Sequence, residues 1–147
     1  MREPILAVRI LLISEEGIFY GLRSIRGENN YFGNRPRWGI PGGRVHQNET
    51  PTDAAILKAY RILGITIKHK DLSLFEERAD PLFNIRWYFF ICSHWEGEFD
   101  AVKLTNFEKI RWIKLHQLRE LRSQKETTDS FLLEVVNSYL TLKPTLP

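Results

Sequence analysis

Lys58 and Arg61, in the middle of the chain, have side chains and a spacing suited to binding a phosphate group. They are three residues apart in a stretch with helical periodicity, so they share one helix face with Ile62. Lysine and arginine both bind phosphate oxygens well, and arginine can bind two of them at once. The pattern favours a site for an anionic group such as a diphosphate. The alternative is that the two cations only keep an exposed helix face solvated.

The residues that must position this face predict a strand end, a glycine turn and one amphipathic helix. Residues 38–40 have the pattern of a short strand, and the Pro-Gly-Gly segment 41–43 suits a tight turn in which a side chain would block the chain. Thr50 can cap the helix, Pro51 suits its first position and Gly64 suits its C-cap. A helix is therefore expected between Pro51 and Gly64.

Segment 43–65 resembles the Nudix box, whose consensus is G-x5-E-x7-R-E-U-x-E-E-x-G-U, with U an aliphatic residue. Gly43 and Glu49 match its first half, and Gly64 and Ile65 match its end. In place of R-E-U-x-E-E the chain reads Leu-Lys-Ala-Tyr-Arg-Ile. The resemblance implies an α/β domain with the Nudix fold, in which a mixed β-sheet is sandwiched between helices.

The resemblance also implies a hydrolase that holds Mg²⁺ or Mn²⁺ on helix carboxylates, with the metal neutralising a pyrophosphate and activating water. Two cations and an aliphatic residue replace those carboxylates here, so this helix face would repel a divalent cation. Glu49 is the box acid that remains. Outside the box, Glu76, Glu77 and Glu108 either rebuild a metal site or are solvated acids at strand edges. A rebuilt site would use Glu49 and Glu77 as ligands, with Glu49 and Glu108 in catalysis.

Residues 34–38 and 41–45 are similar to one branch of the family, the GDP-mannose mannosyl hydrolases. On that analogy Arg35 or Arg37 contacts the diphosphate of the ligand, and Arg44 lies nearby. That branch keeps the box arginine and a final glutamate, and this chain has neither. The ligand implied is a nucleoside diphosphate-linked molecule, with a nucleotide sugar such as GDP-mannose as the leading expectation.

Several aromatic residues suit stacking on a nucleobase. Tyr31 and Phe32 lie in a polar loop that is long enough to carry function. We expect this pair to contact the base ahead of Trp38, Trp87 and Tyr88, because most of the aromatic residues must fill the core.

Length and composition predict one small globular domain. The chain has 147 residues, of which 43% are hydrophobic and 27% charged, and we expect residues 1–142 to form the domain and 143–147 a disordered tail. A net charge of +3 is too weak to indicate nucleic-acid binding. Cys92 is the only cysteine, which excludes an intramolecular disulfide, and its apolar neighbours predict a small buried residue.

The periodicity predicts strands, one helix, more strands and a further helix. The expected strands cover residues 5–14, 18–24, 38–40, 72–78, 85–95 and 109–115, and helical turns are expected at 51–63, 116–122 and 127–140.

Three functions stay open at this level. The first is a divergent hydrolase of nucleotide sugars, and the second is a nucleotide-binding or regulatory module without catalysis. The third is a protein-interaction domain that kept only the fold. The chain shows neither a signal peptide nor a membrane-spanning run, so we expect a cytoplasmic protein. Its expected partner is a nucleotide-type small molecule, with no membrane and no nucleic acid, and a homodimer is left open.

Overall fold

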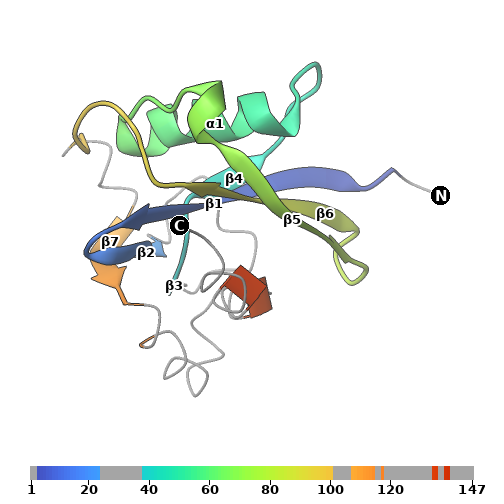
Figure 1. Cartoon of the computed structure of the whole chain (residues 1–147). Helices are drawn as coiled ribbons and strands as arrows, with labels where there is room; N and C mark the ends of the chain where they lie inside the picture. Colours follow the sequence, from blue (N-terminus) through green and yellow to red (C-terminus); the bar gives the residue numbers. More distant parts are fainter. Residues whose placement is uncertain are drawn as a thin grey trace.

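The computed structural model describes residues 3–23, 38–100 and 107–114, with positions 117, 134–135 and 138–139. These residues form a mixed sheet that carries a helix on one face and a helical segment near the C-terminus on the other (Figure 1). The strands are β1 (Ile5–Ser14), β2 (Gly17–Arg23), β3 (Trp38–Gly39), β4 (Gly42–Arg44), β5 (Ser73–Asp80), β6 (Ile85–Cys92) and β7 (Phe107–Ile113). The helices are α1 (Pro51–Leu63) and the short 3-10 helix η1 (His69–Asp71).

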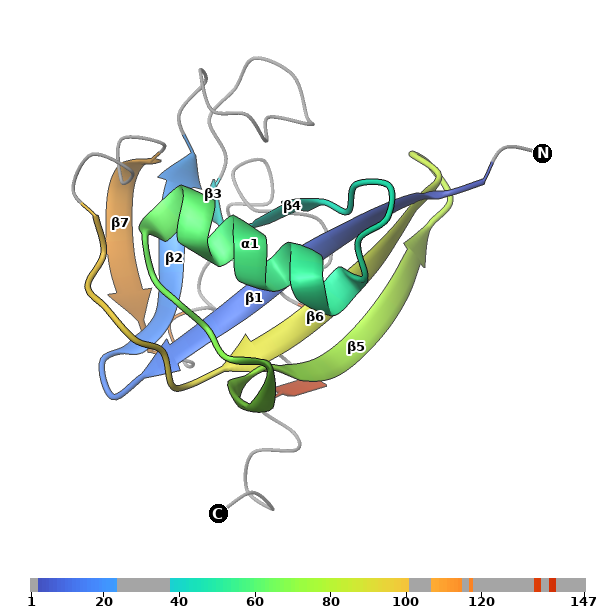
Figure 2. The same ribbon diagram turned by 90° about the horizontal axis from the view of Figure 1, so that it is seen from above.

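The strand β1 lies at the centre of the sheet. The strand order is β3-β2-β1-β6-β5, with β4 paired to β1 and β7 paired to β2. The β1–β6 pair is parallel and the other strand pairs are antiparallel, so the sheet is mixed as expected. Figure 2 shows α1 lying across this sheet, which places the residues of the helix over β1 and β4.

Alternation along β1 divides the core into two layers, because successive side chains of a strand point to opposite faces. Val8, Ile10 and Leu12 face α1 and pack with its small residues Ala54, Ala55 and Ala59. The opposite face is also apolar, and its buried members include Ala7, Leu11, Tyr20, Ile40, Trp87, Phe89 and Val135. A nearly unbroken run of apolar residues in β1 follows from this burial on both faces.

The ends of α1 are set by local signals. The Thr50 side chain accepts a hydrogen bond from the backbone N–H of Asp53 at 3.1 Å, and Pro51 is the first helical residue. Gly64 ends the helix in the left-handed region at φ 80°, and its N–H donates to the carbonyl of Tyr60. Both expected boundaries are confirmed.

Asp53 links the start of α1 to η1. Its carboxylate lies 2.9 Å from Nε2 of His69, and this contact, with the bond from Thr50, holds the pKa of Asp53 below its ordinary value of 3.8. A lowered carboxyl pKa stabilises the fold above the unfolded value, and the contribution is lost as the pH falls through the folded pKa. We therefore expect Asp53→Asn to lower the melting temperature slightly at pH 6 and to have no effect below about pH 3.

Melting curves of both proteins between pH 2.5 and 7 would check this. A difference that stayed constant over the whole range would contradict the role given to the carboxylate.

Two local features differ from the expectations. The Pro-Gly-Gly segment is not a tight turn, because Gly42 and Gly43 begin β4 and pair with Arg9 and Val8 of β1. A Cβ at Gly42 would lie 2.0 Å from the Val8 carbonyl oxygen, so the glycine permits a close approach of two backbones. The short helix η1 was not predicted. The expected segments 116–122 and 127–140 and the tail lie mostly outside the described residues.

Cys92 is buried in the layer beneath α1, as its apolar neighbours predicted. Its Sγ contacts the carbonyl of His94 at 3.2 Å, and burial raises the pKa of the thiol. A thiol in this state is a packing residue with little nucleophilic character.

No helix among the described residues is long and apolar enough to cross a membrane.

Candidate functional site

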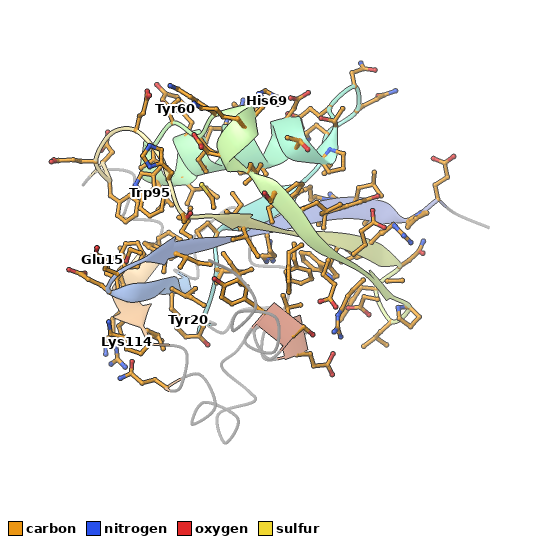
Figure 3. The ribbon with its side chains drawn as sticks, viewed as in Figure 1. Glu15, Tyr20, Tyr60, His69, Trp95 and Lys114 are labelled. Carbon is orange, nitrogen blue, oxygen red and sulfur yellow. The ribbon has the colours of Figure 1, made fainter. Side chains whose placement is uncertain are left out.

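The positions of α1 that replace the box carboxylates do not share one environment. Lys58 is only 7% exposed and Ile62 is only 9% exposed, so both lie on the side of the helix that packs on the sheet. Arg61 is exposed beside them. Tyr60 lies on the outer side of the helix, where Figure 3 shows it pointing away from the sheet.

The burial of Lys58 is the unusual electrostatic feature of the helix. Lysine is almost never this buried unless it is paired, because removing an ammonium group from water costs several kcal/mol. Within the described ranges, no carboxylate lies within ion-pairing distance of Lys58. The helix therefore holds a positive charge against β1 and β4 that the described part of the protein does not neutralise.

Glu49 closes the turn that leads into α1. Its Oε1 accepts a hydrogen bond from the backbone N–H of His46 at 2.8 Å, and its own N–H donates to the His46 carbonyl at 3.1 Å. Asn48 supplies the left-handed residue of this turn at φ 71°. The carboxylate of Glu49 thus orients the segment before Lys58.

The carboxylates outside the box have partners of their own. Glu76 binds Arg78 at 3.1 Å, and Glu77, also on β5, binds Arg86 of the neighbouring strand at 3.1 Å. Glu108 lies in β7, and its side chain is outside the description. Over the described ranges, no group of three or more His, Cys, Asp and Glu side chains is arranged to hold a metal ion.

These carboxylates therefore do not offer Mg²⁺ the several oxygen ligands that it needs. The roles of Glu49, Glu77 and Glu108 in metal binding or catalysis stay predictions.

The other predicted binding residues are placed only in part. Arg44 is exposed at the end of β4, opposite Ala7 in the register of β1. The side chains of Arg35, Arg37, Tyr31 and Phe32 lie outside the described residues.

A second polar feature, which the sequence analysis did not single out, lies on the face opposite α1. Arg9 of β1 is only 2% exposed, and its guanidinium carbon is 4.4 Å from the centre of the Trp87 ring. This is the geometry of a cation–π contact. The signal in the sequence was one charged residue inside an apolar strand, where a charge is rare without a partner.

Comparison with known proteins places the chain in a family. The NUDIX domain model matches residues 3–134. The 8-oxo-dGTP diphosphatase of Escherichia coli K12 is 38% identical over 61 residues, which are 40% of this chain and 46% of that protein. The matched segment thus spans about half the length of that relative.

Solved structures show the same fold. The MutT protein of Methanosarcina mazei Go1 superposes with a TM-score of 0.72 at 16% identity, covering 97% of this chain and 98% of that one. The ORF135 protein of E. coli gives a TM-score of 0.70 at 14% identity, covering 97% and 93%. These likenesses support MutT-type proteins and give no support to the GDP-mannose branch. The chain belongs to the Nudix family and has its α/β fold.

Proposed function

We propose that this Nudix chain binds the diphosphate of a nucleotide-type small molecule through Lys58 and Arg61. The observation that supports the proposal is the burial of the Lys58 ammonium on the sheet side of α1 without a described carboxylate partner. An anionic ligand would neutralise this charge. Arg61, exposed beside Lys58, can add a bidentate contact to phosphate oxygens.

This arrangement replaces one source of positive charge by another. Nudix hydrolases generally use a divalent metal such as Mg²⁺, which acts on the pyrophosphate as a positive charge. Here the side chains at the corresponding helix positions are themselves cationic or apolar, and they do not fit a metal. Binding of the diphosphate is therefore expected without metal, with Glu49 holding the turn before the helix.

Lys58→Met gives a test in which stability and binding move in opposite directions. Removing a buried charge in favour of an apolar chain of similar volume is expected to leave the free energy of unfolding unchanged or to raise it by about 1 kcal/mol. The same change is expected to weaken nucleotide binding by about tenfold or more. Calorimetric titration in EDTA with GTP, ADP-ribose and GDP-mannose, together with thermal melting, would measure both.

Lys109→Met is the matched control, because Lys109 is an exposed lysine on β7. It should change neither quantity. A Lys58→Met variant that loses stability and keeps full affinity would identify Lys58 as a structural residue and overturn the proposal.

A metal-dependent hydrolase is the second candidate, and the diphosphatase named above as a relative favours it. Under this alternative, phosphorus NMR would show turnover of GTP or of a nucleotide sugar in Mg²⁺ but not in EDTA. Glu49→Gln would abolish that turnover.

A further inference from the structure

Arg9 and Trp87 place hydrogen-bond donors in an otherwise apolar layer on the face of the sheet opposite α1. Arg9 is 2% exposed and Trp87 is 3% exposed, and their neighbours in this layer are apolar residues and Tyr20. Figure 3 shows Tyr20 pointing away from α1 on this side of the sheet. The Arg9 Nη1 donates to the Val8 carbonyl at 3.1 Å.

The indole N–H of Trp87 has no acceptor among the described residues, although the nitrogen is fully buried. Buried N–H groups nearly always have a partner, and an exception calls for an explanation such as a ligand. A guanidinium carries several N–H donors, so Arg9 can serve the Val8 carbonyl and a ligand together. The two side chains offer donors and no acceptor, which defines the ligand chemistry that they could read.

We propose that Arg9 and Trp87 recognise the base of the bound nucleotide and select guanine over adenine. This inference rests on the proposed binding of a nucleotide diphosphate at Lys58. Guanine presents two acceptors on one edge, O6 and N7, and arginine is their usual bidentate partner. Adenine presents an amino group in place of O6, which would oppose the donors of Arg9.

The path from the diphosphate to this layer passes around one strand. In the register of β1 and β4, Gly43 pairs with Val8, which faces α1, and Gly42 pairs with Arg9, which faces the other way. In the described part of the sheet, β4 pairs only with β1. A strand is only about 4.8 Å from the next one, so a nucleotide can reach both faces around the edge of β4.

Small residues keep the place of Arg9 open. A Cβ at Gly42 would lie 2.8 Å from Nη1 of Arg9, and Ala7 is the preceding residue on the same face of β1. The guanidinium can therefore lie flat between β4 and the ring of Trp87.

The test compares GTP with ATP by calorimetric titration in EDTA. The wild-type protein is expected to bind GTP about tenfold more tightly than ATP. Trp87→Phe keeps the aromatic ring and removes the N–H, so it should weaken GTP severalfold and leave ATP unchanged. Arg9→Met should bring the two affinities close together. Lys58→Met should weaken both nucleotides equally, because it acts on the phosphates.

The indole N–H resonance of Trp87 provides a second readout that a purely structural tryptophan would not give. Its signal, identified by its absence in Trp87→Phe, should shift with GTP and stay in place with ATP. Equal affinities of the wild-type protein for GTP and ATP, or a Trp87→Phe variant with unchanged GTP affinity, would overturn this inference alone. A protein that bound neither nucleotide would overturn the proposed function and this inference with it.

Discussion

Replacing Phe19 by alanine is expected to lower the free energy of unfolding by about 3–5 kcal/mol. Phe19 is fully buried in β2, and its ring makes edge-to-face contacts with the rings of Phe99, Phe107 and Trp112 at centroid distances of 5.4, 5.5 and 5.6 Å. Truncation removes all three contacts and leaves a cavity between segments that are distant in sequence. Chemical denaturation with an unchanged m-value would measure the loss.

Phe19→Leu is the matched variant, because it fills most of the volume and removes only the aromatic geometry. It should cost about 1–2 kcal/mol. Leu82→Ala, at a residue that is 81% exposed, should stay within about 0.5 kcal/mol of the wild type. A Phe19→Ala variant that behaved like Leu82→Ala would show that the aromatic cluster does not hold β2 and β7 to the rest of the core.

Gly42→Ala is expected to lower the free energy of unfolding by about 2–3 kcal/mol and also to weaken nucleotide binding. The added Cβ would lie 2.0 Å from the Val8 carbonyl oxygen and 2.8 Å from Nη1 of Arg9, so β4 must move away from β1. That movement separates the strand that lies between Lys58 and Arg9. Denaturation and calorimetric titration of the same preparation would measure both effects.

Arg44→Ala is the control in the same strand, since Arg44 is exposed and lies outside the close backbone approach. Its stability should stay within about 0.5 kcal/mol of the wild type. Normal stability in Gly42→Ala would mean that β4 can shift at little cost, and that Gly42 is not required for the pairing with β1.

The sequence predicted those parts of the fold that local signals determine. The helix α1 was found with both ends because Thr50, Pro51 and Gly64 act on their own neighbours. The strand β1 was found because burial on both faces leaves a long apolar run. The strand β4 was missed because two glycines suit a turn as well as a close strand pair, and only the position of Val8 decides between them.

The candidate site was harder to predict because it depends on burial. Periodicity placed Lys58 and Arg61 on a common face but could not show that Lys58 lies against the sheet while Arg61 stays exposed. That difference depends on how α1 packs on β1 and β4. The contact between Arg9 and Trp87 joins residues of two parallel strands that are far apart in sequence, so no local pattern contains it.

The capping of α1 has a consequence for how such a protein can change its chemistry. The signals that start and end the helix lie at positions 50, 51 and 64, outside the six positions where the family carries its reactive side chains. Those six positions can be rewritten while the frame around them stays in register. The helix then works as an exchangeable cassette that can display carboxylates to recruit a metal, or ammonium and guanidinium groups that meet a phosphate directly. Either version directs positive potential toward the same place.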